Sequence, residues 1–330
     1  MSNRIPLPIR DGLNPSRIIV PQEYAGNTAH QVVSILIDTQ RYRHPQDDEA
    51  AIDARFAQGE VVGEWGDPYA PEDILTEGDH LWFYRMPAEE EPVPYEIQRI
   101  YEDEDILVVD KPPFLATFPR ASHITETLLV RMRRQTGNND LVPAHRLDRL
   151  TSGILVMVKT PALRGAFQQL FAERKISKQY EAIAHKSDTV KPGDLWAHRL
   201  EKTHGVLRTE VVEGEPNSFT KVLDVRPVTY ENAPLSLRAE ADAGLVNLDD
   251  LAIYRLGPIT GKTHQLRVHM MLAGVPILGD PIYPVMLPKE EEDFAHPMYL
   301  HASRLSFIDP RDSTPQEFTS WYDCVHDLNE

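Results

Sequence analysis

Apolar residues occur along the chain in short runs, in alternating stretches and at helical spacing. These patterns predict its strands and helices. Runs of strand length cover residues 106–109 and 154–158, and an alternating stretch over 180–184 also indicates a strand. A helix is expected over 125–135, because it ends at Gly137 and glycine favours the left-handed position that closes a helix. The segment between this helix and the second strand is therefore a loop framed by two rigid elements.

A second helix is predicted after Thr160, which can cap it, with Pro161 in the first turn. Its apolar stripe recurs at three- and four-residue spacing and comprises Leu163, Ala166, Phe167, Leu170 and Phe171. A stripe of this kind faces a protein core. We therefore interpret its aromatic side chains as packing residues and not as a platform on which bases stack.

The N-terminal part of the chain has the pattern of a separate unit. Residues 78–85 combine a Gly-Asp turn with a strand. The segment from Ala88 to Pro94 contains three consecutive glutamates and two prolines, which is typical of a linker. We therefore expect a small N-terminal domain over residues 1–90.

The composition is that of a soluble globular protein, with 41% hydrophobic and 26% charged residues in a chain of 330. This length suggests about two domains. No apolar run reaches the roughly 18 residues of a transmembrane helix, and the first residues lack the hydrophobic core of a signal peptide. Cys324 is the only cysteine, which excludes an intrachain disulfide and a thiolate metal site and fits a reducing cytoplasm.

The net charge of −17 argues against a nucleic-acid partner, but the charge is unevenly distributed. Residues 1–110 hold 8 arginines, no lysine and 23 acidic residues, whereas residues 131–186 hold 11 basic and 4 acidic residues. Because salt screens charges over about 8–10 Å, the basic segment can attract phosphates locally although the whole molecule is acidic. A solvated helix face is the alternative explanation for any single arginine.

The basic segment contains the most informative motif of the chain, His145-Arg146-Leu147-Asp148-Arg149-Leu150-Thr151-Ser152-Gly153. Its carboxylate, Asp148, stands between Arg146 and Arg149, an arrangement that keeps an acid ionised. It also lies on a loop between rigid elements, where catalytic groups are commonly held. A surface ion pair is the simpler explanation. The pattern H-R-L-D-x-x-T-S-G, however, resembles the signature of the RluA-like pseudouridine synthases at every fixed position.

A second segment that resembles this family is Lys178-Gln179-Tyr180. The alternation of a strand puts Lys178 and Tyr180 on the same face of the sheet. The resemblance implies that the Tyr180 ring lies against the target base. For the tyrosine taken alone, a half-buried strand residue is the alternative.

The third segment, residues 260–269, reads Thr-Gly-Lys-Thr-His-Gln-Leu-Arg-Val-His and resembles the family pattern T-G-R-x-H-Q-L-R-x-H. Lys262 replaces the first arginine, which keeps the charge but loses a planar two-pronged donor. A helix is expected here that ends at Gly274 and has an apolar side of Leu266, Met270 and Ala273. We predict no metal site at His264 and His269, because they are five apart and neither cysteine nor an H-E-x-x-H pattern accompanies them.

The resemblance extends over about residues 95–310, the predicted catalytic domain, which leaves 311–330 as a C-terminal tail. It implies the α+β pseudouridine-synthase fold, with a mixed, largely antiparallel sheet and a central catalytic cleft. Members usually carry a Lys-Pro-x-Gly turn after the first strand. Because Phe114 occupies the glycine position, we expect this turn to be built differently. Residues 1–90 resemble the αL-type RNA-binding domain of many relatives, although that domain is usually basic.

The resemblance implies an isomerase that converts uridine to pseudouridine in structured RNA, ribosomal or transfer, without a cofactor. Asp148 would act on the ribose, either by attacking the anomeric carbon or by removing the neighbouring proton. Arg267 would hold Asp148 ionised and oriented through a charge-assisted contact. Tyr180 would stack on the base and assist removal of the proton from carbon 5. Arg146 would occupy the place that the flipped-out base leaves.

We expect further RNA contacts from polar and cationic residues near these motifs. They are Arg149, Lys178, Lys262, His264 and Gln265, together with Arg131, Arg133 and Arg134 at the end of the first predicted helix. A cytoplasmic monomer with no membrane contact and no metal is expected. Two other functions stay open: an RNA-binding protein that has kept the fold without catalysis, and a carboxylate-dependent glycosidase. The glycosidase normally needs two partnered carboxylates, and the motif loop has one.

Overall fold

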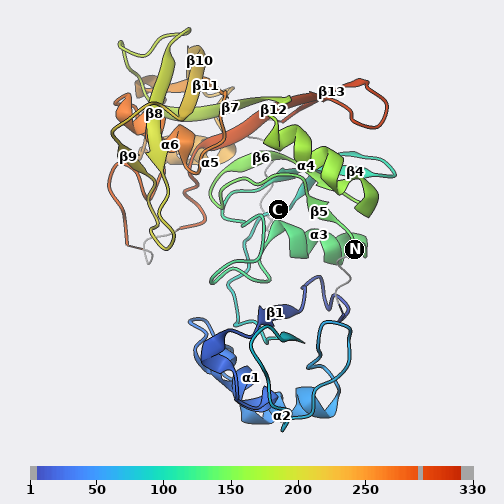
Figure 1. The fold of residues 1–330 in the computed structure, drawn as a ribbon. Helices are drawn as coiled ribbons and strands as arrows, with labels where there is room; N and C mark the ends of the chain where they lie inside the picture. Colours follow the sequence, from blue (N-terminus) through green and yellow to red (C-terminus); the bar gives the residue numbers. More distant parts are fainter. Residues whose placement is uncertain (1–5, 289–292, 321–330) are drawn as a thin grey trace. The chain divides into compact units, whose positions relative to one another are not determined.

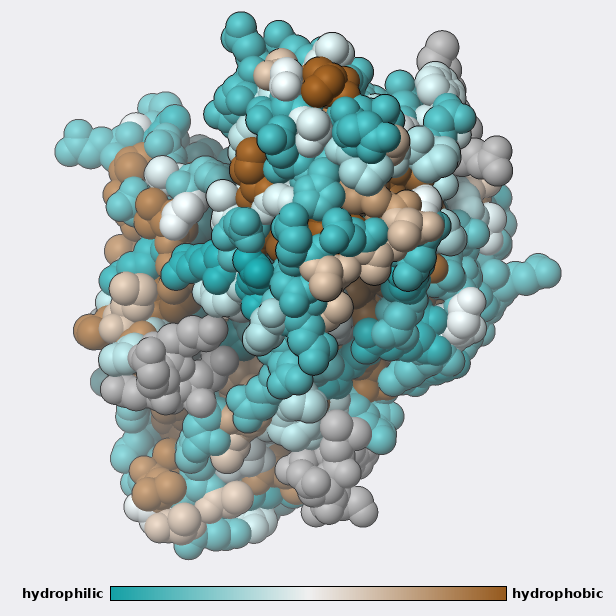
Figure 2. Space-filling model, turned by 90° about the horizontal axis from the view of Figure 1, so that it is seen from below, coloured by the Kyte–Doolittle hydropathy of each residue, from teal (hydrophilic) through white to brown (hydrophobic). Residues whose placement is uncertain are grey.

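The computed structural model describes residues 6–288 and 293–320, which form two compact units (Figure 1). The first unit comprises residues 1–92 and 118–139, and the second unit comprises 93–117 and 140–330. Within the described ranges, no helix is long and apolar enough to cross a membrane. The face of the molecule drawn in Figure 2 is mainly hydrophilic, and its hydrophobic side chains form small separate groups.

The first unit packs helices against a two-stranded sheet. β1 (Ser16–Ile19) pairs antiparallel with β2 (His80–Phe83), which confirms the strand predicted within 78–85. The helices are η1 (Gln22–Tyr24), α1 (Ala29–Asp38), α2 (Glu49–Ala57) and α3 (Leu128–Thr136). The core consists of buried apolar side chains from β2, α1 and α2, among them Val32, Ile37, Ile52, Leu81 and Phe83.

Helix α3 confirms the helix predicted over 125–135, with a start three residues later. The Thr127 hydroxyl accepts a hydrogen bond from the N–H of Val130 and caps the helix there. The helix ends at Gly137, whose φ of 66° is the left-handed value expected.

The division of the chain differs from the domains that we expected. α3 falls inside the predicted catalytic domain, 95–310, but packs with the first unit. One physical reason is that Arg133, which is buried, donates to the carbonyl oxygen of Gly12 and to the side chain of Asn14, at 3.1 Å each. The expected boundary near residue 90 lies close to the observed break after Pro92.

The second unit is built on one sheet, which has eleven strands within the described residues. The strands are β3 (Gln98–Glu102), β4 (Ile106–Lys111), β5 (Val142–Pro143), β6 (Ser152–Val158), β7 (Ile176–His185), β8 (Leu195–Glu201), β9 (Glu210–Val212), β10 (Ser218–Pro227), β11 (Leu251–Pro258), β12 (Leu300–Ile308) and β13 (Pro315–Thr319). Their order is β3-β4-β6-β12-β7-β11-β10-β8-β9, with β5 on β6 and β13 on β12. β6 and β12 pair in parallel and the other described pairs are antiparallel, which confirms the mixed, largely antiparallel sheet.

Helices pack on this sheet (Figure 1). They are η2 (Pro161–Leu163), α4 (Arg164–Ala172), α5 (Leu235–Asp242), η3 (Leu248–Asp250) and α6 (Gln265–Leu272). Phe167 of α4 is fully buried beside β6 and β12, with Leu170 and Phe171 packed against the same cluster. The predicted stripe is therefore confirmed as a packing surface.

Strand β13 lies within the segment that we expected to be a tail. Its backbone pairs with β12, and Phe318 is buried in the same cluster as Phe167. A single apolar residue between polar neighbours gives too little periodicity to predict such a strand. Residues 321–330 of the expected tail, including Cys324, lie outside the described residues.

Gly153, the last residue of the Asp148 motif, is required where β6 meets β12. Its φ is 111°, and a Cβ placed there would lie 2.5 Å from the backbone nitrogen and oxygen of Ala302. Ala302 is its partner in the parallel pairing. A side chain at this position would both strain the backbone and separate the two strands.

We predict that Gly153→Ala lowers the free energy of unfolding by at least about 2 kcal/mol, because strain and overlap act together. Gly165→Ala in α4 is the matched control: its Cβ would meet nothing within 4 Å, and alanine favours a helix by about 0.5–1 kcal/mol. Urea unfolding of both variants measures the difference. Equal stability of the two variants would contradict the close-approach argument.

Candidate active site

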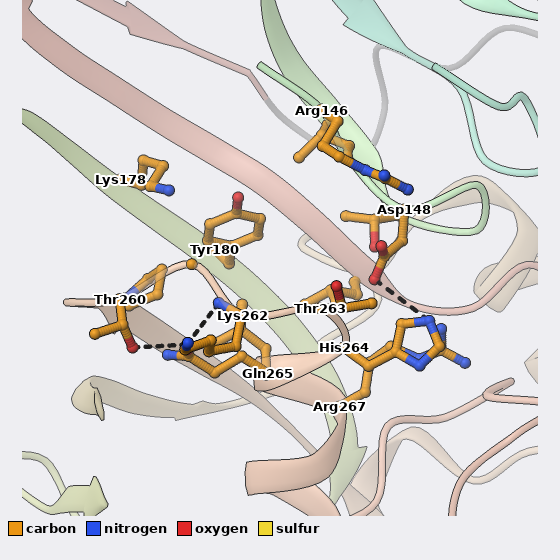
Figure 3. A pocket seen from close by; sticks show the side chains of 16 residues that line it. Arg146, Asp148, Lys178, Tyr180, Thr260, Lys262, Thr263, His264, Gln265 and Arg267 are labelled. Carbon is orange, nitrogen blue, oxygen red and sulfur yellow. Dashed lines mark hydrogen bonds and ion pairs between the residues drawn. The ribbon is translucent and has the colours of Figure 1, made fainter. Parts of the chain in front are cut away.

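One pocket in the second unit brings together the three motifs (Figure 3). Its space is about 670 Å³, part of which is open to solvent. The lining side chains of the motifs are Arg146, Leu147, Asp148, Thr151, Lys178, Tyr180, Thr260, Lys262, Thr263, His264, Gln265, Leu266 and Arg267, and Pro258, Gly261 and Leu300 complete the wall. Segments more than 100 residues apart in the sequence therefore share one site, as the motifs predict.

Backbone hydrogen bonds fix the loop on both sides of Asp148. Before it, the Thr117 hydroxyl donates to the carbonyl oxygen of Leu147 (2.8 Å) and lies 3.2 Å from its N–H. After it, the buried ammonium group of Lys111 donates to the carbonyl oxygen of Arg149 (3.1 Å). The half-buried carboxylate, with 23% of its side chain exposed, is thus presented from a rigid loop.

The turn after Lys111 has Phe114 at the position where the family usually has glycine. Phe114 adopts a φ of 63°, in the left-handed region that glycine favours. The phenylalanine therefore adopts a backbone conformation that glycine takes with less strain. Its buried ring contacts Tyr95 and Phe294, with centroids 6.3 and 5.1 Å away. This packing offsets the strain, which is of order 1 kcal/mol or more.

Arg267 does not make the contact that we expected. Its guanidinium forms a two-pronged salt bridge with Asp280, with Nε–Oδ2 and Nη2–Oδ1 distances of 2.7 and 2.6 Å. Both side chains are almost completely buried. Burial opposes the charge on Arg267, but the hydrogen bonds and the charge of Asp280, with a contribution from Asp148, raise its pKa. Arg267 therefore acts on Asp148 through its charge, while Asp280 fixes its orientation.

The sequence analysis missed Asp280. It lies thirteen residues after Arg267, in a loop without any period that would bring the two together. The available signal was an acid after Gly279 in an otherwise apolar stretch. A Cβ on Gly279 would lie 2.3 Å from the carbonyl oxygen of Pro297, so only glycine fits before this acid.

Tyr180 and Lys178 line the same wall of the pocket from β7, which confirms that they share a face. Burial raises the pKa of Tyr180, and the negative charge of Asp148 adds to this effect. The hydroxyl therefore stays protonated at neutral pH. Burial also lowers the pKa of Lys178, and its ammonium group points into the pocket beside the Tyr180 ring (Figure 3).

His264 lies beside Asp148, where the sequence suggested an RNA contact. Its Nε2 is 4.0 Å from Oδ2 of Asp148, and 11% of its side chain is exposed. Burial lowers the pKa of His264 to about 4, with Arg267 and Lys202 acting in the same direction and Asp148 and Asp280 opposing them. The imidazole is therefore neutral at physiological pH.

Gln265 holds the pocket wall and does not offer its amide to RNA. Its Oε1 accepts from the Thr260 hydroxyl (2.7 Å) and from the N–H of Lys262 (3.1 Å). Its Nε2 donates to the carbonyl oxygen of Phe219 and to the hydroxyl of Thr220, both at 2.9 Å. The predicted role in RNA binding is wrong for this side chain, because these bonds occupy the amide.

The expected cationic residues divide into two groups. Arg146 and Lys262 are exposed at the pocket, where RNA can reach them. Arg149 does not line the pocket and donates to the carbonyl oxygen of Phe114 (3.3 Å).

The three arginines of α3 belong to the first unit and make contacts within it. Arg131 pairs with Glu126, Arg134 pairs with Asp11, and Arg133 is buried against Gly12. Burial excludes Arg133 from contact with RNA, which corrects that prediction. Its cation instead satisfies backbone and amide oxygens of the N-terminal segment.

His269 faces the core and not the pocket. Its ring nitrogens lie 2.9 and 3.1 Å from the hydroxyls of Thr220 and Ser218, and burial lowers its pKa to about 4. Within residues 6–288 and 293–320, no group of three His, Cys, Asp or Glu side chains is placed to hold a metal ion.

Comparisons with known proteins agree with the motifs. A sequence profile of the family described as RNA pseudouridylate synthase matches residues 105–272, about half of the chain. The dual-specificity RNA pseudouridine synthase RluA of Yersinia pestis is 32% identical over 222 residues, which are 66% of this chain and 96% of that protein. The ribosomal large subunit pseudouridine synthase D of Neisseria meningitidis serogroup B is 28% identical over 321 residues, 91% of this chain and 77% of that protein.

A solved structure shares the fold. Human RNA Pseudouridylate Synthase Domain Containing 1 superposes with a TM-score of 0.50 at 24% identity, over 73% of this chain and 92% of that chain. The profile and the relatives agree with the three motifs that meet in the pocket. The chain therefore belongs to the RNA pseudouridylate synthase family and is an isomerase that converts uridine to pseudouridine in RNA.

Proposed function

We propose that the pocket holds a uridine of a structured RNA, ribosomal or transfer, and that Asp148, Tyr180 and Arg267 form its catalytic centre. One observation carries this assignment: among the described residues that line the pocket, Asp148 is the only one with a carboxylate, and each of the three motifs contributes a side chain to the same pocket. One relative is named as a ribosomal large subunit pseudouridine synthase, which favours ribosomal RNA among these classes.

The reaction requires that the bond between ribose carbon 1′ and base nitrogen 1 breaks and that a bond from carbon 1′ to carbon 5 forms. Asp148 starts it in one of two ways. It attacks carbon 1′, and the resulting ester bond breaks when carbon 5 bonds to carbon 1′, or it removes the proton from carbon 2′ and returns it there when the base rejoins. After the base has turned and rejoined, carbon 5 loses its proton and nitrogen 1 gains one. The overall change is an isomerisation, so no cofactor is needed.

The positive charge of Arg267 acts on the Asp148 carboxylate, and the buried Asp280 prevents the Arg267 guanidinium from turning away. The Tyr180 ring stacks on the uracil. Because its hydroxyl is protonated at rest, Tyr180 assists loss of the carbon-5 proton as a relay, which passes on its own proton as it accepts another.

The target base has to leave its helix or folded loop to reach Asp148, at a cost of a few kcal/mol. Arg146 is exposed beside Asp148, and its guanidinium plane is suited to stack where the base was. Lys178 and Lys262 add positive charge around the entering nucleotide. We propose that the protein does this as a monomer in the cytoplasm.

The two alternative functions are less consistent with this pocket. A glycosidase that uses paired carboxylates needs a second acid facing the first, and the other nearby acid, Asp280, is buried against Arg267. An inactive RNA-binding protein would not need to keep the catalytic set. Asp148, Tyr180 and Arg267 all line the pocket.

Asp148→Asn is expected to abolish turnover while RNA affinity changes by less than about twofold. The substitution removes the ionised oxygen but keeps the size, and most affinity comes from phosphate contacts. Release of tritium from RNA labelled at uridine carbon 5 measures turnover, and filter binding measures affinity. Turnover at the wild-type rate would contradict the role of Asp148.

Arg267→Met should lower turnover at least about 100-fold, roughly 3 kcal/mol of barrier. It should also lower the free energy of unfolding by about 3–5 kcal/mol, because it leaves Asp280 buried without a counter-charge. The double variant Arg267→Met, Asp280→Asn separates the two effects. It should regain part of the stability but none of the turnover; recovery of turnover would show that Arg267 only neutralises Asp280.

Tyr180→Phe tests the hydroxyl apart from the ring. Stacking is kept, so RNA affinity should stay within about twofold, while turnover should fall at least about 100-fold through loss of the proton step. The rearranged base should then accumulate on the enzyme and be seen by mass spectrometry of quenched reactions. An equal loss of affinity and turnover would instead identify Tyr180 as a structural residue of β7.

A further inference from the structure

The His264 imidazole connects the catalytic carboxylate to a buried tyrosine. Its Nδ1 lies 3.0 Å from the hydroxyl of Tyr283, and its Nε2 lies 4.0 Å from Oδ2 of Asp148. The Tyr283 oxygen accepts a hydrogen bond from the N–H of Thr209 (2.7 Å), and it lies 3.3 Å from the carbonyl oxygen of the same residue. Figure 3 shows the His264 ring next to Asp148 at one end of the pocket.

Two arguments place the single ring proton of the neutral imidazole on Nε2. The Tyr283 hydroxyl has one proton to give, and its distance to His264 Nδ1 is shorter than its distance to the Thr209 carbonyl. With Nδ1 as the acceptor, Nε2 carries the N–H and faces the Asp148 carboxylate. The opposite tautomer would direct a nitrogen lone pair at that negative charge.

The backbone of His264 is strained, which indicates that the surrounding structure holds its imidazole in this position. His264 has a φ of 55°, in the left-handed region, directly before the first residue of α6. This conformation costs a side chain of this size of order 1 kcal/mol. Helix capping does not offset this cost, because the His264 side chain makes no capping hydrogen bond. The conformation instead turns the imidazole towards Tyr283 and Asp148.

Burial keeps the His264 ring uncharged. Arg267 and Lys202 oppose protonation of His264, while Asp148 and Asp280 favour it, and burial decides in favour of the neutral form. A neutral donor differs from Arg267 in its effect on Asp148. It can orient the carboxylate by a hydrogen bond without a full positive charge, which would weaken the carboxylate as a nucleophile or base.

We propose that His264 is a positioning residue for Asp148, fixed by Tyr283 in the tautomer that presents Nε2–H to the carboxylate. This inference rests on the proposed role of Asp148 in catalysis. The 4.0 Å separation closes to a hydrogen bond when the carboxylate turns towards bound ribose, in the way that catalytic contacts tighten in the substrate complex. The charge of Arg267 then stabilises the Asp148 carboxylate, and the hydrogen bond from His264 orients it.

Two substitutions at His264 separate positioning from folding. Asparagine tolerates the left-handed backbone but is too short to bring an N–H to Asp148, whereas glutamine places its amide N–H near the position of Nε2. Tyr283→Phe keeps the ring but removes the hydroxyl that fixes the tautomer. His185→Leu is the control, because His185 is exposed at the end of β7 and outside the pocket.

The experiment measures single-turnover tritium release and RNA affinity, with uridine-labelled RNA from cells that lack this protein. His264→Asn should lower the rate about 30- to 100-fold, comparable to the loss of one preorganised donor, with affinity within about twofold. His264→Gln should recover to within about tenfold of wild type, Tyr283→Phe should lose about tenfold, and His185→Leu should match wild type.

Three results would overturn the proposal: a His264→Asn rate within about threefold of wild type, an equal loss of rate and affinity, or a folded His264→Gln variant as slow as His264→Asn. Thermal unfolding of each variant establishes that it is folded. Wild type and Asp148→Asn are measured in the same assay. An active Asp148→Asn variant would refute the proposed function itself, whereas failure of the His264 series alone refutes only this inference.

Discussion

The attachment of the Asp148 loop to buried backbone partners is the interaction on which the rest of the site depends. Lys111, the last residue of β4, and Thr117, in the segment after β4, bind the loop through Arg149 and Leu147 on either side of the carboxylate. Burial lowers the pKa of Lys111 to about 7, with Arg149 acting in the same direction and Asp148 and Asp110 opposing them. A buried lysine at this place is acceptable because backbone oxygens surround its ammonium group. Asp148 consequently has a fixed position to which the other groups are matched.

The electrostatics of the pocket are arranged in two layers around that carboxylate. The inner layer consists of Arg267 and the neutral His264. Each is fixed by a residue outside the motifs: Arg267 by a salt bridge to Asp280, and His264 by a hydrogen bond with Tyr283. The outer layer consists of exposed cations at the pocket, such as Arg146 and Lys262, to which we assign the contacts with RNA. This arrangement explains how an acidic protein can act on RNA. The favourable charge lies at the pocket, where screening over about 8–10 Å limits the influence of distant acids.

The motifs predicted which side chains meet in the pocket because each motif is local: a carboxylate on a loop, a tyrosine on a strand, an arginine on a short helix. Strand periodicity correctly put Lys178 and Tyr180 on one face. Contacts between distant segments could not be predicted in the same way. Arg267 meets Asp280 and not Asp148, and Gln265 turns its amide to Phe219 and Thr220. Which partner a polar side chain binds depends on which hydrogen-bonding groups lie within reach once the sheet has formed.

Charge counting along the sequence was the weakest guide. The arginines of α3 lie in the basic segment, yet Arg133 is buried against Gly12 and Asn14 in the first unit. A cation that is close to a motif in the sequence can thus stabilise a different structural unit from the one that contains the motif. Phe114 is a second example, because it adopts a left-handed backbone, which glycine favours, in the turn next to the Asp148 loop. Packing around the Phe114 ring offsets the backbone strain. A local sequence pattern does not predict such packing, because the contacting residues are distant in the sequence.

The central claim, that this chain forms pseudouridine in RNA through Asp148, is tested most directly by mapping pseudouridine across total RNA from cells that lack the protein. The map is repeated after complementation with the wild-type chain and with the Asp148→Asn chain. We predict that one or a few uridines in ribosomal or transfer RNA lose the modification in the deletion strain. The wild-type chain should restore them, and the Asp148→Asn chain, produced at the same level, should not. An unchanged map in the deletion strain, or restoration by the Asp148→Asn chain, would contradict the account.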